Sequence, residues 1–187
     1  MKPKSTLSVN LAPDLKRYGV RYQPGSWLKG FLSRPMVRFT TALRLCQRYG
    51  AKHPIGAVAR AYYQLVSTRY GMQVPHVTRI GKGLFIGHWG NIVINHKAVI
   101  GNYCNIGQGV TLGYVSRGSK QGCPTLGDRV WIGANAVVVG NIRVGNDVLI
   151  APLSFVNQDI PDRAVVVGNP GKIVSYNSSE GYLKYID

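Results

Sequence analysis

Four histidines are the side chains in this sequence best suited to move a proton near neutral pH: His53, His76, His88 and His96. His88 is singled out because it comes directly before residues 89–91, where a regular sequence repeat slips by two residues. A slip of this kind pushes backbone and side chains outward and creates a site that the plain repeat lacks. His88 is therefore the candidate general base for chemistry on a hydroxyl group. The alternative is a histidine that only fills a turn and bonds a carbonyl.

The spacing of the histidines and cysteines argues against a metal site. His76 and His88 are 12 residues apart and His88 and His96 are eight apart, so the members of each pair fall on different corners of the repeat described below. The three cysteines are odd in number and form no Cys-x-x-Cys motif, which argues against a disulfide framework and a zinc knuckle. We expect no metal, and a reducing cytosolic environment.

The elements that must position His88 follow from an interval of six residues. An aliphatic residue, usually followed by a small or turn-forming one, recurs at Val74, Ile80, Ile86, Ile94, Ile100, Ile106, Leu112, Leu126, Ile132, Val138, Val144, Ile150 and Val156. This period predicts short strands joined by tight corners, three to a coil, with the aliphatic side chains stacked inside. The small residue is expected to allow a corner with positive φ. Separate strands of a sandwich would instead show a period of two with irregular turns.

The flanking segments have a different character. Residues 1–70 form a basic region with two expected helices, over 27–49 and 54–70, while residues 71–174 carry the repeat and residues 175–187 form a polar tail. The 14-residue gap in the period, at 113–125, is rich in Gly, Ser and basic residues and predicts a protruding loop. The chain is thus expected to be mainly β, with a small N-terminal helical region.

The charge is concentrated in that basic region. The chain has a formal net charge of +16, and residues 1–70 hold 13 Lys and Arg against one acidic residue, Asp14. Such a segment favours an anionic partner. One alternative is that its helices pack only on each other and on the first coil. The other is a face that lies on an anionic membrane or a lipid-linked substrate, made of Lys29, Arg34, Arg38, Arg44 and Arg48 beside Trp27, Leu28, Phe31 and Leu32. Nucleic acid is not favoured, since no recognition motif surrounds the basic residues.

The run IGKGLFIGHWGNIVINHKAVIGNYCNIGQGVTLG, followed by CPTLGDRVWIGANAVVVGNIRVG and VVVGNPGKIV, resembles the serine acetyltransferase group of hexapeptide-repeat acetyltransferases. Within it, the sequence looks most like members that O-acetylate colanic-acid or capsular polysaccharides. The likeness extends from Gly71 to Val174. It implies a left-handed parallel β-helix, a homotrimer, and acetyl transfer from acetyl-CoA with His88 as general base.

The resemblance also implies contacts for both substrates. Residues implied for acetyl-CoA are Gly113, Trp131, Gly133, Ala134 and Lys172. Residues implied for the acceptor are Gln73, Asn91, His96 and Cys123.

Two departures bear on the acceptor. Gln73 stands where serine acetyltransferases carry an aspartate that orients the base, and Cys123 stands where they carry a histidine that helps to hold serine. We therefore expect a sugar hydroxyl of a surface polysaccharide as acceptor, on a free or lipid-linked glycan. The enzyme is expected to be cytoplasmic, either free or peripheral at the inner face of the membrane. The alternatives are serine O-acetyltransfer and a non-catalytic β-helix scaffold that binds polyanions.

Overall fold

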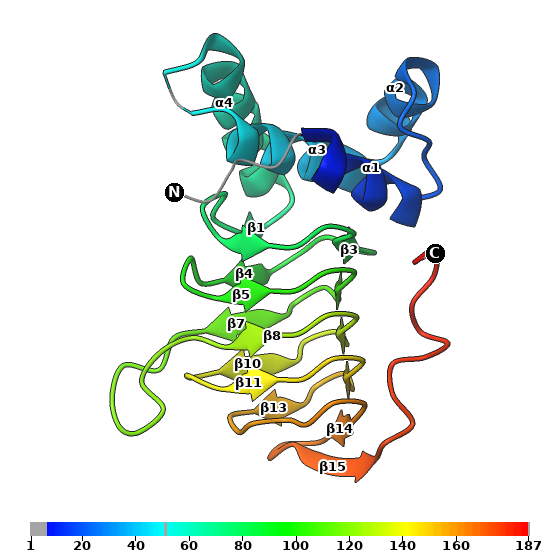
Figure 1. Ribbon diagram of the computed structural model, residues 1–187. Helices are drawn as coiled ribbons and strands as arrows, with labels where there is room; N and C mark the ends of the chain where they lie inside the picture. Colours follow the sequence, from blue (N-terminus) through cyan, green and yellow to red (C-terminus); the bar gives the residue numbers. More distant parts are fainter. Residues whose placement is uncertain (1–6, 51, 187) are drawn as a thin grey trace.

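A computed structural model describes residues 7–50 and 52–186, with helices at one end and a triangular prism of short strands below them (Figure 1). The helices are α1 (Leu7–Arg17), α2 (Pro24–Ser33), α3 (Pro35–Arg48) and α4 (Pro54–Arg69). The strands are β1 (Met72–Gln73), β2 (Arg79–Ile80), β3 (Phe85–Ile86), β4 (Ile92–Ile94), β5 (Val99–Ile100), β6 (Asn105–Ile106), β7 (Thr111–Gly113), β8 (Thr125–Leu126), β9 (Trp131–Ile132), β10 (Val137–Val139), β11 (Arg143–Val144), β12 (Leu149–Ile150), β13 (Phe155–Val156), β14 (Val165–Val167) and β15 (Lys172–Ser175).

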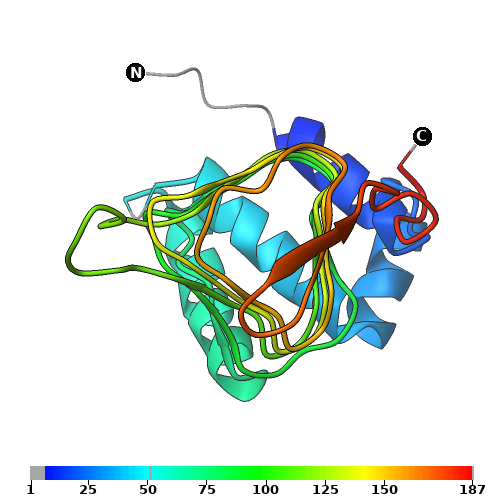
Figure 2. The ribbon, with the colours of Figure 1, turned by 90° about the horizontal axis from the view of Figure 1, so that it is seen from below.

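The strands form three sheets, one on each side of the prism. The first sheet has the order β1-β4-β7-β10-β13, the second β11-β8-β5-β2, and the third β15-β14-β12-β9-β6-β3. All pairings between successive coils are parallel, and only β15 pairs antiparallel, with β14. This arrangement confirms the predicted parallel β-helix with three strands to a coil, and Figure 2 shows its triangular cross-section.

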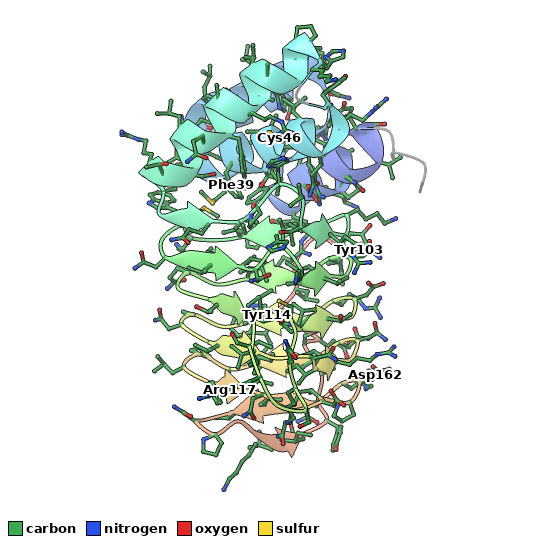
Figure 3. All side chains as sticks on the ribbon, turned by 90° about the vertical axis from the view of Figure 1, so that its left-hand side faces the viewer. Phe39, Cys46, Tyr103, Tyr114, Arg117 and Asp162 are labelled. Carbon is green, nitrogen blue, oxygen red and sulfur yellow. The ribbon has the colours of Figure 1, made fainter. Side chains whose placement is uncertain are left out.

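The interior is the column of aliphatic side chains that the six-residue period predicts. All 13 phased residues are buried, and they belong to one continuous core that also includes Phe39 and Tyr63 of the helical region. The rings of Phe39 and Tyr63 have centroids 5.3 Å apart. The helices therefore close one end of the prism, as Figure 3 shows for Phe39 and Cys46 above the first coil.

Where glycine follows the aliphatic, the structure gives a different reason for it from the one expected. A Cβ on Gly101 would lie 2.2 Å from the carbonyl oxygen of Gly127 in the next coil, so the corner has no room for a side chain. The positive φ occurs two residues further on, at Tyr103 (57°) and Arg129 (56°). Successive coils approach so closely at this corner that stacking, and not backbone conformation, selects glycine.

Two segments leave the regular coil. Residues 114–124 protrude between β7 and β8 as a loop that contains Tyr114 and Arg117 (Figures 2 and 3), and the backbones of Val115 and Gly122 hydrogen-bond to each other at its base. The C-terminal tail runs back along the third sheet. Its residue Ser179 donates from Oγ to the Arg129 carbonyl at 2.7 Å.

The helical region differs from the prediction in two ways. The helix expected over 27–49 is divided into α2 and α3 at Arg34, because Pro35 disfavours a helical conformation at the residue before it. Helix α1 was not expected at all, and none of the helices described is long and apolar enough to span a bilayer.

Arg44, which the sequence placed on a basic face in one of the two alternatives, is buried. Its Nε donates to Asp14 Oδ2 at 2.6 Å, and its Nη1 donates to the Ile80 carbonyl at 3.0 Å. Asp14 also accepts from the backbone N–H of Leu84 at 2.9 Å. This ion pair joins α1 and α3 to the first coil, so Arg44 is not available to a partner.

Candidate active site

A groove of about 1260 Å³ lies between α4 and the outer face of the first sheet. Helix α4 forms one wall, and strands β1, β4 and β7 with the adjoining corner form the other. The residues on the α4 side are Arg60, Tyr63, Gln64, Ser67 and Thr68. Those on the β-helix side include Gln73, His76, Asn91, Val93, Asn95, His96, Gly113 and Tyr114.

The groove brings together three of the residues considered for the acceptor. Gln73 points outward from β1 and pairs in register with Val93 of β4. Asn91 lies just before β4 and His96 just after it, so the three side chains reach the groove from its middle and its two ends. Cys123 does not line the groove. It is half-buried at the base of the protruding loop, packed against the core.

Two groove residues were not assigned a substrate contact from the sequence: His76, which was weighed only among the histidines and as a metal ligand, and Arg60. The register β1–β4 places Pro75 level with Asn95, so His76 and His96 occupy the same corner in successive coils. Their separation of 20 residues equals one coil of 18 residues plus the two-residue slip. This spacing is the feature of the sequence that could have predicted that the two histidines share a corner. Arg60 comes from α4, and no repeat pattern could have placed it against the first coil.

The positive charge of the groove comes from the Arg60 guanidinium. Burial lowers the pKa of His76, and the nearby Arg60 guanidinium lowers it further, so the His76 imidazole is neutral at neutral pH. No Asp or Glu is among the groove residues named above, and the chain has none between Asp14 and Asp128. Burial raises the pKa of the Tyr63 phenol, and Ser67, buried beside it, opposes that shift. The Ser67 Oγ makes no hydrogen bond of normal geometry among the residues described. A guanidinium with unused hydroxyl and amide groups suits a small anionic or zwitterionic ligand.

His88 lies at the corner between β3 and β4, exposed to solvent and outside the lining of the groove. The neighbouring Trp89 packs against Tyr70 at the end of α4, with ring centroids 5.7 Å apart. Asn91 has a φ of 50°, a conformation that asparagine tolerates better than most residues. The Trp89–Tyr70 contact thus packs residues 89–91 against the end of α4. The His88 imidazole has no hydrogen-bond partner within the described part of the chain.

The corner that carries His88 recurs on the coils below it, as a column of equivalent positions. The register of β3, β6 and β9 places His88, Gln108 and Ala134 on successive coils. Adjacent strands are about 4.8 Å apart, so Ala134 lies roughly 10 Å from His88 along the axis. Gly133, beside Ala134, is small because a Cβ there would lie 2.5 Å from the backbone nitrogen of Pro152.

The other residues considered for acetyl-CoA are dispersed. The Trp131 ring lies on the third sheet and contacts the ring of Tyr182 in the tail, with centroids 5.1 Å apart. Lys172 is exposed on β15, at the end of the prism opposite the helices (Figure 1). Gly113 lies at the far end of the first sheet from the His88 corner. Residues 7–50 and 52–186 contain no group of three His, Cys, Asp or Glu side chains that could hold a metal ion.

Several known proteins are similar to this chain in sequence and in fold. Residues 123–158 match the family described as bacterial transferase hexapeptide (six repeats). The serine acetyltransferase of Synechococcus elongatus is 42% identical over 104 residues, 56% of this chain and 43% of that protein. Serine acetyltransferase 4 of Arabidopsis thaliana is 34% identical over 149 residues, 80% of this chain and 40% of that protein. The chain thus spans less than half the length of these two relatives.

A solved structure gives a more extensive match. The serine acetyltransferase of Neisseria gonorrhoeae, crystallised in complex with serine, is 31% identical with a TM-score of 0.67, covering 90% of this chain and 69% of that one. This likeness confirms the expected left-handed β-helix.

The comparisons correct the expected substrate and establish the family. The relatives are serine acetyltransferases, so the expectation of a polysaccharide O-acetyltransferase is wrong and the alternative, serine acetyltransfer, is the better supported one. The prediction was wrong because it gave the two departures, at Gln73 and Cys123, more weight than a similarity to serine acetyltransferases that extends over most of the chain. By its repeat, its fold and these relatives, the chain belongs to the bacterial hexapeptide-repeat transferases.

Proposed function

We propose that this protein is an acetyl-CoA-dependent serine O-acetyltransferase. The observation that carries the proposal is the likeness, over 90% of the chain, to a serine acetyltransferase solved with serine. The groove beside the His88 corner supports it, because its arginine and amide groups suit a zwitterionic amino acid. Since the groove is larger than one amino acid, serine occupies only the end nearest to Asn91 and His88.

His88 acts as the general base in this proposal. Its imidazole takes the proton from the serine hydroxyl while the hydroxyl oxygen attacks the thioester carbonyl carbon of acetyl-CoA. The carbon–sulfur bond then breaks, and the CoA thiolate leaves and is protonated. An exposed imidazole at a corner is reachable by both substrates, with the thioester arm lying along the column that leads to Ala134.

The groove supplies the amino-acid contacts. The amide oxygens of Gln73 and Asn91 accept hydrogen bonds from the serine ammonium group. The Arg60 guanidinium lies beside His76 at the other end of the groove and attracts the serine carboxylate through its positive potential, without touching it. The positive charge is thus supplied by α4, and Cys123 need not contribute one.

A homotrimer completes the site. The group that orients the His88 imidazole must come from outside the described part of this chain, because no described side chain or carbonyl bonds to it. A neighbouring subunit packed against the His88 corner would provide that group and would cover the column of His88, Gln108 and Ala134.

The test is acetyl transfer followed by mass spectrometry of the amino-acid product, with serine, threonine and glucose offered as acceptors. We expect O-acetylserine from the wild type and a fall in kcat of about 10² to 10⁴ for His88→Ala. The matched control is His53→Asn, because His53 accepts from the backbone N–H of Ile55 at 3.2 Å as a helix cap, and asparagine keeps that bond. Acetylation of glucose but not serine would contradict the proposed acceptor, and full activity of His88→Ala would contradict the proposed base.

A further inference from the structure

The helical region has an apolar groove on its side facing away from the β-helix. The groove has a volume of about 450 Å³ and is lined by Trp27, Phe31, Ala42, Ile55, Val58 and Tyr62 among others. Phe31 of α2 and Tyr62 of α4 stack across it with centroids 5.8 Å apart, and α3 forms its floor. Figure 1 shows α2 and α4 extending away from β1 at this end of the molecule.

The rim of this groove exposes large aliphatic side chains. On α2 the exposed pair is Leu28 and Leu32, four residues apart and hence on one face, with Leu32 67% exposed. On α4 they are Ile55, Val58 and Leu65, spaced by three and seven residues, with Val58 72% exposed. Two helices that both leave aliphatic stripes in solvent on either side of one apolar groove indicate a surface that is covered in use.

The same surface is surrounded by cations without acidic partners. No acidic residue occurs between Asp14 and Asp128, and Asp14 is buried against Arg44. Lys29 and Lys52 are exposed next to the aliphatic rim, and Arg38 lies close enough to Tyr62 to act on its hydroxyl electrostatically. The charge here is therefore free to meet an anionic partner.

We propose that this α2–α4 surface binds peripherally to a lipid bilayer that contains anionic headgroups. Basic side chains beside exposed aliphatic and aromatic ones are the combination that such a bilayer takes up, with the headgroups meeting the cations and the acyl region taking the Leu and Val side chains. A nucleic acid would use the cations and leave the aliphatic stripes in water. A second copy of the chain would bring two cationic rims together with no acidic side chain on either side to offset them.

The inference is independent of the proposed acetyl transfer, and its test needs no activity. The full-length protein is sedimented with phosphatidylcholine vesicles that contain a quarter phosphatidylglycerol, and with pure phosphatidylcholine vesicles. We expect binding to the anionic vesicles and a partition coefficient that falls as salt is added. Lys29→Gln with Lys52→Gln should lower the partition coefficient about 25-fold, at roughly five-fold for each charge.

The apolar part has its own variant and control. Leu32→Ser with Val58→Ser should lower the partition coefficient by about 10-fold or more, because each serine removes a side chain that inserts into the bilayer. Val174→Ser is the matched control, since Val174 is 61% exposed on β15 at the opposite end of the prism and should leave binding unchanged. All five substituted side chains are exposed, and circular dichroism with thermal unfolding checks that the fold is kept.

Three outcomes would overturn the inference. One is equal binding to neutral and anionic vesicles with no effect of salt. Another is binding by the Leu32→Ser and Val58→Ser variant at the wild-type level. The third is no vesicle binding, with the surface occupied by nucleic acid in a gel-shift assay or by a second copy in light scattering.

Discussion

The buried ion pair between Asp14 and Arg44 offers a sharp test of how the helical region is attached to the β-helix. The pair has side-chain exposures of 0% and 1% and an Nε–Oδ2 distance of 2.6 Å. Burial raises the pKa of Asp14 although Arg44 opposes that shift, which indicates that desolvation outweighs the attraction between the charges. Such a pair stabilises little relative to an apolar core, but losing one member leaves an unpaired buried charge.

We expect Asp14→Ala to lower the free energy of unfolding by about 3 to 5 kcal/mol. The substitution leaves the Arg44 guanidinium with only neutral acceptors, including the Ile80 carbonyl, and takes the acceptor from the backbone N–H of Leu84. Arg44→Ala should cost a similar amount at pH 7. In that variant the raised Asp14 pKa means that the folded state binds the proton more tightly, so stability should fall as the pH rises from about 4.

The double variant Asp14→Ala with Arg44→Ala should lose about 2 kcal/mol less than the sum of the two single variants. Removing the second charge relieves the unpaired charge that the first substitution created. Urea unfolding followed by far-ultraviolet circular dichroism, at one fixed protein concentration, measures all three values. Losses that simply add would refute the reasoning, since they would mean that the two side chains do not interact.

A second ion pair in the molecule is the natural control. Arg129 Nε lies 2.6 Å from Asp147 Oδ1, the same distance as in the buried pair, but the side chains are 41% and 27% exposed. Asp147→Asn should cost less than about 1 kcal/mol, and asparagine suits the φ of 56° at this position. The hydrogen bond from Arg129 lowers the pKa of Asp147, so this contribution is present above the ordinary carboxyl pKa and is lost as the pH falls through the lowered one. Equal costs for the two pairs would show that burial is not the deciding factor.

Two further predictions concern packing and thiol reactivity. Gly101→Ala should lower the free energy of unfolding by about 3 kcal/mol or more, because the new Cβ would lie 2.2 Å from the Gly127 carbonyl oxygen; an unchanged melting temperature would contradict this. Cys123, half-buried, should react with a thiol reagent in the folded protein, faster at higher pH because burial raises its pKa and the thiolate is the reactive form. Cys104, whose pKa burial raises to about 12, should react only after unfolding, and mass spectrometry that finds it modified in the folded protein would contradict that expectation.

The β-helix could be predicted from the sequence because each coil repeats the same local demand. Every sixth residue must be aliphatic to fill the interior, and at corners such as Gly101 the residue after it must be small because the next coil lies directly against it. Both requirements recur at intervals of six residues and can therefore be recognised in the sequence. The division of the helical region at Arg34 also left a signal, Pro35, which the apolar spacing across it concealed.

The attachment of the helices could not be predicted, because it depends on polar side chains that find partners far along the chain. Asp14 is held by Arg44 and by the backbone of Leu84, and Arg17 donates to the Tyr103 carbonyl at 3.1 Å. A polar residue in a short basic segment reads as a surface residue until such partners are known. For the same reason Arg60 was not considered as a groove residue, although its place between α4 and the first coil decides the charge of that groove.

Helix α4 connects the two sites that we propose. One side of it carries Arg60, Gln64 and Ser67 into the groove on the first sheet, and another side exposes Val58 and Leu65 to the proposed bilayer surface. Between these two sides, buried residues that include Tyr63 fix the helix to α3 and the first coil, so α4 cannot turn without disrupting the core. Binding at the bilayer surface would therefore set the orientation of the whole prism without reshaping the groove. On this reasoning Leu32→Ser with Val58→Ser should release the protein from vesicles and leave serine acetylation in solution unchanged.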